Sequence, residues 1–215
     1  MKIGTRSVLF GAHAFWLHPF ILAEAWRRLF GFPWDPRLWV LFFVHDLGYL
    51  GKPNMDGPEG ETHVELGARI MTALFDGTRY VLRVEDRPPR FLILGDFGLL
   101  SLLHSRFYAK RLGMRPSKLC LADKLAICLT PAWLYLPMTR LTGELSEYMS
   151  RSEQKEGQKY ATMVIYSSDE RQWYENMRGY VGRWVEAHKD GREDTWTPAQ
   201  EPGQRQPADG SGTWR

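Results

Sequence analysis

The sequence contains few cysteines, and this limits its chemistry. Only two of its 215 residues are cysteines, Cys120 and Cys128, and both lie in an apolar stretch that we expect to be helical. Eight positions along a helix span about 12 Å, which is too far for a disulfide bond. We therefore expect two reduced core thiols, as is usual in a cytoplasmic protein, rather than a disulfide-stabilised secreted domain.

Long hydrophobic runs are also missing. No stretch of about 18 uncharged apolar residues occurs, so the sequence predicts no transmembrane segment. The most apolar stretches, 38–44, 91–103 and 125–138, are short or contain a charge, as buried core helices do. The N-terminus lacks the features of a signal peptide. A peripheral membrane contact through tryptophan and phenylalanine side chains stays open.

The net charge of the chain is small. A formal net charge of +3 suits a small anionic ligand, but the basic residues are too few and too spread out to predict nucleic-acid binding. With 44% hydrophobic and 13% aromatic residues, most of the chain can form a packed core. Residues 189–215 differ, because they are poor in apolar residues and rich in Gly, Pro, Gln and charge, so we expect a disordered tail there.

Hydrophobic spacing, caps and breakers predict an all-α fold, a helical bundle with little or no strand. We expect one helical domain over 1–188, with a ligand-bearing core at about 12–135 and a helical extension at about 142–188. Residues 80–95 are ambiguous, because they fit either a small hairpin or the approach to one long helix at 90–112. The expected helices are 7–17, 19–30, 36–47, 61–75, 117–128 and a terminal helix that is capped by Ser168 and ends near 188.

The histidines are concentrated in the first half of the chain. His13, His18, His45, His63 and His104 lie in apolar or helix-terminal contexts, whereas His188 is expected at the surface. A single buried histidine is usually a hydrogen-bonded core residue. Several histidines and aspartates together are costly to bury, and a shared divalent cation relieves that cost. Helices of a bundle can bring such side chains together around one ion.

The order of these residues resembles the HD-domain phosphohydrolase superfamily, whose hallmark is H…HD…D. His18, the His45-Asp46 pair and Asp123 in "LCLADKLAI" follow that order. The stretches "ETHVELGARI" and "LLHSRFYAKRLG" are similar to later histidine-bearing segments of the family. The resemblance covers roughly residues 12–135. It implies a helical fold of the HD type and a hydrolase that acts on phosphoric ester bonds.

Residue by residue, the resemblance implies that His18, His45, Asp46 and Asp123 bind one divalent ion. His63 and His104 would bind a second ion bridged by Asp46, or would contact substrate phosphate and move protons. Asp46, His63 and His104 are thus the expected catalytic residues. The cofactor is one or two ions of Mn, Fe, Mg, Co, Ni or Zn.

The first ligand is ambiguous in sequence, because both His13 and His18 can be placed before His45 by a helix-turn-helix. We favour His18, which opens the helix expected to pack against the HD helix. His13 would then lie in the pocket or behind the ligands.

Phosphate chemistry also needs cations beyond the metal. The candidates for substrate binding are Lys52, Arg106 and Lys110, whereas Lys124 is expected to point away from Asp123. The long Gly- and Pro-rich loop at 49–61 could act as a lid or specificity loop.

The expected substrate is a nucleotide or a related small phosphorylated metabolite. The sequence lacks the Glu-Asp pair after HD that (p)ppGpp hydrolases use and the Gly-Tyr-Pro signature of cyclic di-GMP phosphodiesterases. Two other functions stay open: a non-catalytic HD module that senses a nucleotide or metal, and an HD-fold di-iron oxygenase. Tryptophan-rich segments also leave open whether the chain forms a homo-oligomer.

Overall fold

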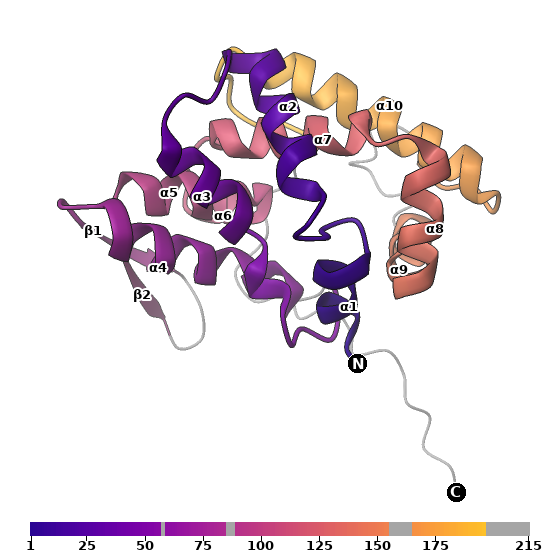
Figure 1. The fold of residues 1–215 in the computed structure, drawn as a ribbon, viewed down its shortest axis with the longest axis horizontal. Helices are drawn as coiled ribbons and strands as arrows, with labels where there is room; N and C mark the ends of the chain where they lie inside the picture. The colour runs from indigo at the N-terminus through magenta and orange to yellow at the C-terminus, as the bar shows by residue number, and fades with distance from the viewer. Residues whose placement is uncertain (57–58, 85–88, 155–164, 197–215) are drawn as a thin grey trace, which may run out of the picture.

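Helices dominate the computed structural model, which describes residues 1–56, 59–84, 89–154 and 165–196 (Figure 1). This part of the chain holds ten α-helices and a single two-stranded hairpin, so the expectation of a mainly helical fold is confirmed. The elements are α1 (Ile3–Phe10), α2 (His18–Phe30), α3 (Pro36–Val44), η1 (Leu47–Tyr49), η2 (Gly60–His63), α4 (Val64–Phe75), β1 (Tyr80–Val84), β2 (Arg90–Leu94), α5 (Asp96–Leu102), α6 (Arg106–Arg111), α7 (Lys118–Leu129), α8 (Ala132–Thr142), α9 (Glu144–Gln154) and α10 (Glu170–His188).

Local signals fix several helix starts. Asp35 accepts a hydrogen bond from the backbone of Arg37 and begins α3, and Ser117 caps α7 in the same way. The first expected helix, 7–17, is wrong: α1 spans Ile3–Phe10 and ends at Gly11. The reason is a long-range contact, because the backbone N–H of Ala12 donates to the buried carboxylate of Glu144.

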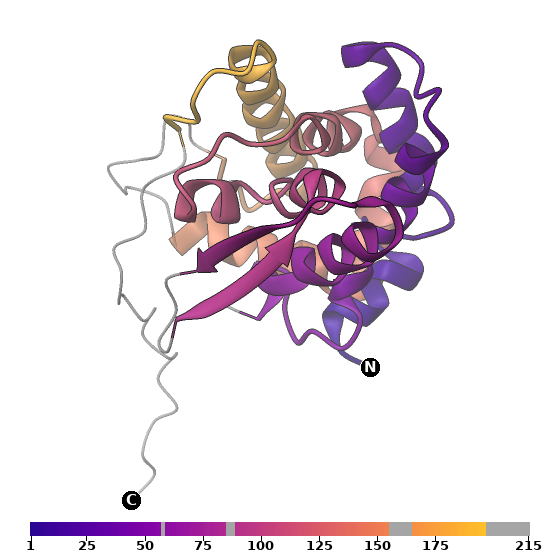
Figure 2. The ribbon, with the colours of Figure 1, turned by 90° about the vertical axis from the view of Figure 1, so that its left-hand side faces the viewer.

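The ambiguous region at 80–95 forms a hairpin. Strands β1 and β2 pair antiparallel, with Tyr80 opposite Leu94, and lie beside α4 (Figure 2). Leu92 and Leu94 are buried while Phe91 and Ile93 are exposed, which is the alternation of a strand with one covered face. Two short helices, α5 and α6, then replace the alternative single helix at 90–112.

The central core lies between α2, α3, α4 and α7. Helix α2 packs along α7 and also against α3, and α3 packs against α4. Their shared faces are mostly apolar, so these four helices are held in fixed relative positions. The buried members of this cluster are Leu22, Ala23, Ala25, Trp26, Leu41, Phe42, Met71, Leu119, Ala122 and Ala126.

The packed part of the C-terminal half continues further along the chain than the sequence indicated. The terminal helix begins after Asp169, whose carboxylate caps it, and not after Ser168. The surface prediction for His188 is wrong: its ring is buried, stacks on Trp184 and bonds the Trp184 carbonyl oxygen through Nδ1. Residues 189–196 of the expected disordered tail pack onto α10 through Asp194 and Trp196. Residues 197–215 of that tail lie outside the described residues.

Asp194 holds this last segment in place, and its loss should destabilise the protein. Its carboxylate accepts hydrogen bonds from Trp184 Nε1 at 3.1 Å and from Arg106 Nε at 3.1 Å. Asp194→Ala breaks a mostly buried ion pair, so we expect the free energy of unfolding to fall by about 2–4 kcal/mol. Urea denaturation measures this, with the exposed Asp190→Ala as the matched control. Equal midpoints for both variants would contradict the prediction.

No single helix of the described chain is long and apolar enough to cross a membrane. Helices α7 and α8 reach that length and composition only as a pair, and they are bent by 104° at the break between them.

Candidate metal centre

Four buried side chains from three helices meet at one point. His18 is the first residue of α2, His45 and Asp46 directly follow α3, and Asp123 lies in the middle of α7. Each offers a ligand atom within 4.8 Å of the others. His18 Nε2 lies 3.2 Å from Asp123 Oδ1 and 3.6 Å from Asp46 Oδ2. The structure brings the four residues of this predicted set together, with His18 rather than His13 among them, and metal binding by them stays a prediction.

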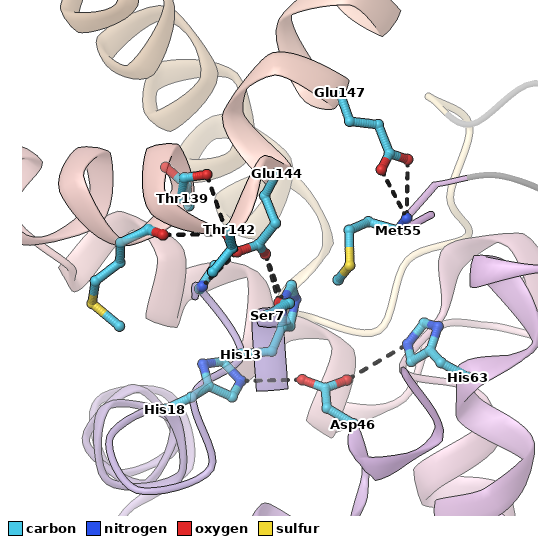
Figure 3. A network of polar contacts seen from close by, with 12 residues as sticks. Ser7, His13, His18, Asp46, Met55, His63, Thr139, Thr142, Glu144 and Glu147 are labelled. Atoms are coloured by element: carbon cyan, nitrogen blue, oxygen red, sulfur yellow. Dashed lines mark hydrogen bonds and ion pairs between the residues drawn. The ribbon is translucent and has the colours of Figure 1, made fainter. Parts of the chain in front are cut away.

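A second group shares Asp46 with the first. Asp46 Oδ1 lies 3.3 Å from His104 Nε2 and 3.6 Å from His63 Nε2, while Oδ2 lies 3.0 Å from His45 Nε2. Figure 3 shows His18 and His63 on opposite sides of the Asp46 carboxylate. The two oxygens of one aspartate therefore face two different sets of histidines. These are the places where two ions could be bridged by a single carboxylate.

Three of the histidines are held with Nε2 toward the centre. His45, His63 and His104 each bond, through Nδ1, the backbone carbonyl oxygen three residues earlier, at 3.1, 2.7 and 2.5 Å. A carbonyl only accepts hydrogen bonds, so Nδ1 carries the proton and Nε2 of the neutral ring presents a lone pair. This arrangement is typical of histidines that bind metals.

Two lone pairs face each other in the second group. His63 Nε2 and His104 Nε2 are 3.1 Å apart. With both Nδ1 atoms protonated, this contact needs a cation or a shared proton between the rings. Burial and the neighbouring charge of His104 hold the pKa of His63 well below its usual value, which favours its neutral, ligand-competent form.

Several buried ligand atoms of the first group lack a hydrogen-bond partner among the described residues, as expected of a site that can bind a cation. Although the contacts above are short, His18 Nε2, His45 Nε2 and Asp46 Oδ2 make no well-aligned hydrogen bond within the described residues. An unsatisfied buried polar atom costs about 1–3 kcal/mol. Imidazole and carboxylate donors together suit a divalent transition metal. The residues present therefore fit a metal ion, whose identity they do not select.

Both aspartates are held in the ionised form that a metal requires. Burial alone would raise the pKa of Asp46, but its interactions with the rings of His45, His13 and His104 hold that pKa well below its usual value. Burial would also raise the pKa of Asp123, which Lys124 and His18 instead hold low. Contrary to the expectation that Lys124 points away, its Nζ lies 2.9 Å from Asp123 Oδ2.

Two neighbours of the site were missed in the sequence. Tyr49 stacks on His63 with ring centroids 3.8 Å apart, and burial raises its pKa well above the usual value. Its position three residues after Asp46 was the available signal. Glu144 is fully buried behind His13, and its place in a polar stretch gave no signal at all.

The interaction of His13 with Glu144 predicts a pH-dependent stability. Burial would lower the pKa of His13, but Asp46 and Glu144 raise it to about 9 from 6.5. The stabilisation is therefore complete below pH 6.5 and lost as pH rises through 9, amounting to about 3 kcal/mol at most. Urea unfolding of metal-free protein between pH 6.5 and 9 measures this. Glu144→Gln should flatten the slope, and His188→Gln should keep it; an unchanged slope in Glu144→Gln contradicts the prediction.

The three residues expected to bind substrate form hydrogen bonds with residues outside the candidate metal centre. Lys52 Nζ bonds Thr62 Oγ1 at 2.5 Å. Arg106 bonds the Asp194 carboxylate, and Lys110 Nζ bonds the Asp194 carbonyl oxygen at 3.1 Å. None of these three lines the cavity at the metal ligands. Substrate contact by Lys52, Arg106 or Lys110 stays a prediction.

The described part of the loop that was expected to act as a lid is hydrogen-bonded to two helices. The Lys52 carbonyl oxygen accepts from Gly4 N at 3.1 Å, and the Gly51 N–H donates to Thr5 Oγ1 at 2.8 Å. Met55 N and Asp56 N donate to the carboxylate of Glu147 in α9. The loop is thus fixed to α1 and α9, residues 57–58 lie outside the described residues, and a lid role stays a prediction.

Comparison of the chain with protein families, with curated proteins and with solved structures finds no match. The likeness to an HD-type site rests on the buried histidine and aspartate cluster itself.

Proposed function

We propose that this protein is a metal-dependent phosphohydrolase of the HD type. Its substrate would be a nucleotide or a related small phosphorylated metabolite, cleaved at a phosphate ester bond. The observation that carries the proposal is Asp46, whose two oxygens face two separate sets of buried histidine nitrogens.

Each residue of the cluster has a role in this proposal. His18, His45, Asp46 and Asp123 would hold the first divalent ion, and Asp46, His63 and His104 would hold a second. A bound divalent ion supplies Lewis-acid polarisation of a phosphoryl oxygen and lowers the pKa of water at the site. The backbone carbonyls behind His45, His63 and His104 fix their rings, and Lys124 keeps Asp123 anionic. Burial and the neighbouring His104 keep the pKa of His63 low, so its neutral ring would present an Nε2 lone pair to the second ion.

The complete ligand set favours an enzyme over a non-catalytic sensor, because both groups of ligand atoms are present and buried. The same pair of groups also suits a di-iron oxygenase, which makes that function the second candidate. The two candidates differ in substrate and in the need for oxygen, so one assay separates them.

Metal analysis followed by a substrate screen tests the proposal. Purified protein is analysed for bound ions and then incubated with nucleoside mono-, di- and triphosphates and cyclic dinucleotides, in the presence of Mn or Mg. We expect about one to two ions per chain and phosphate or nucleotide release. Oxygen consumption without phosphate release would establish the second candidate instead. Absence of both metal and turnover would overturn the enzyme proposal.

A further inference from the structure

Exposed aromatic side chains are concentrated in one part of the chain. Among the described residues, ten phenylalanine, tyrosine and tryptophan side chains are exposed, and seven of these lie between residues 10 and 43. They belong to α1, α2 and α3 and to the segments that join these helices. A single exposed ring is common in soluble proteins, whereas a group of them marks a surface that contacts another apolar phase or partner.

Contacts place most of these rings at the two ends of the α2–α3 pair. At one end, the rings of Phe20 and Phe43 meet edge to face with centroids 5.8 Å apart, and Phe15 and Phe43 line the same cavity. At the other end, Phe32 and Trp34 have ring centroids 4.4 Å apart. The 13 residues of α2 separate the two ends by about 20 Å, so one small ligand cannot contact both. We call this surface the aromatic face, and it comprises Phe15, Trp16, Phe20, Phe32, Trp34 and Phe43.

Arginines lie along α2 between the two groups of rings. Glu24, Arg27 and Arg28 follow Phe20 at helical spacing and share its exposed side of the helix, which Figure 2 shows on one outer side of the molecule. Both arginine side chains are about half exposed, and each bonds the Glu24 carboxylate at 2.7 Å. Lys118 Nζ lies 5.3 Å from the ring of the last residue of α2. Cations therefore outnumber the single carboxylate here.

The charge of this region selects the kind of partner. Between residues 10 and 43 the only other charged side chains are Asp35 and Arg37, which pair with each other at 2.7 Å. Three arginines and two carboxylates leave one net positive charge, and Lys118 adds a second. A symmetric dimer through this face would bring these unbalanced charges together, which disfavours a second copy as the partner. Aromatic rings beside exposed arginines instead match the headgroup region of an anionic bilayer.

The most exposed of the rings projects from a well-held turn. Trp34 is 83% exposed. The turn that carries it is fixed because Asp35 caps α3 and because Trp39 Nε1 donates to the Pro33 carbonyl oxygen at 3.1 Å. The ring is thus presented to solvent by an ordered backbone, which reduces the entropy cost of inserting it into another phase.

We propose that the aromatic face binds the surface of an anionic lipid bilayer, with its rings in the headgroup region and with Arg27, Arg28 and Lys118 at lipid phosphates. The inference goes beyond the proposed hydrolase function and does not depend on it. Phe15 and Phe43 also line the small cavity beside the candidate metal ligands, so binding would bring this side of the metal centre toward the bilayer.

Co-sedimentation of the full-length protein with lipid vesicles tests this. Vesicles of phosphatidylcholine alone are compared with vesicles that also contain phosphatidylglycerol. The wild type should bind the anionic vesicles more tightly, and added salt should weaken that binding. Trp34→Ser should weaken it roughly tenfold or more, because a large apolar side chain no longer leaves water. Arg28→Gln should weaken binding to anionic vesicles roughly fivefold and leave binding to neutral vesicles unchanged.

Trp133→Ser and Arg140→Gln are the matched controls, because both residues lie on α8 and outside the aromatic face. Trp133 is 75% exposed, and Arg140 is an exposed arginine paired with a glutamate, as Arg28 is. Both variants should bind vesicles within about twofold of wild type. All four substitutions are at exposed positions, so their melting temperatures should match that of the wild type.

Three results would overturn the inference: no binding of the wild type to anionic vesicles, unchanged binding in Trp34→Ser, or equal losses in Trp34→Ser and Trp133→Ser. A dimer in sedimentation equilibrium that Trp34→Ser dissociates would also overturn it and would assign the aromatic face to self-association. The outcome is independent of the proposed function. Vesicle binding by a protein that holds no metal and has no turnover would overturn the hydrolase proposal alone, and turnover without vesicle binding would overturn this inference alone.

Discussion

Asp46→Asn should abolish both metal binding and turnover. The amide keeps the shape of the side chain but replaces one oxygen with a donor and removes the charge. Both ligand groups depend on this residue, through Oδ1 and Oδ2 separately, so one substitution affects every bound ion. We expect metal content below about a tenth of wild type and turnover reduced roughly 10³-fold or more. Elemental analysis and phosphate release on the same preparation measure the two effects.

Asp56→Asn is the matched control for this experiment. Asp56 lies in the following loop, is exposed, and belongs to neither ligand group. We expect this variant to keep its metal and its turnover. Full metal content in Asp46→Asn would show that this carboxylate is not a bridge, whereas equal losses in both variants would point to a general defect of folding.

The candidate ligand set could be predicted because local signals in the sequence place each of its members. Pro19 and Gly31 mark the ends of α2, Asp35 caps α3, and Ser117 caps α7. The places of His18, His45 and Asp123 in or next to these helices therefore follow from the sequence. Once these helices pack through their apolar faces, the polar residues at the start of α2, directly after α3 and in the middle of α7 are brought together.

The surroundings of the ligands could not be predicted in this way, because they depend on contacts between distant segments. Glu144 approaches His13 across 131 positions, and Arg106 reaches Asp194 across 88. Arg106 lies two residues from His104, yet its guanidinium lies over the Trp184 ring of α10. Closeness in sequence therefore suggested a role at the metal site, whereas the direction of α6 turns this side chain toward the C-terminal segment.

Saturation with a divalent ion should raise the melting temperature by about 10 °C. In metal-free protein, His18 Nε2, His45 Nε2 and Asp46 Oδ2 are buried without a hydrogen bond among the described residues, and His63 and His104 oppose their lone pairs. An ion that binds only the folded chain, at about a thousand times its dissociation constant, adds about 4 kcal/mol. For a chain of 215 residues that corresponds to about 8–16 °C.

Thermal unfolding of chelator-treated protein, with and without Mn, Zn or Mg, measures this shift and also ranks the ions. Asp46→Asn should show a shift below about 2 °C with any of them, because it lacks the shared ligand. His13→Gln should keep the full shift, since its ring belongs to neither ligand group. A wild-type melting temperature that no divalent ion changes would mean that protons, not metals, balance the charges of this cluster.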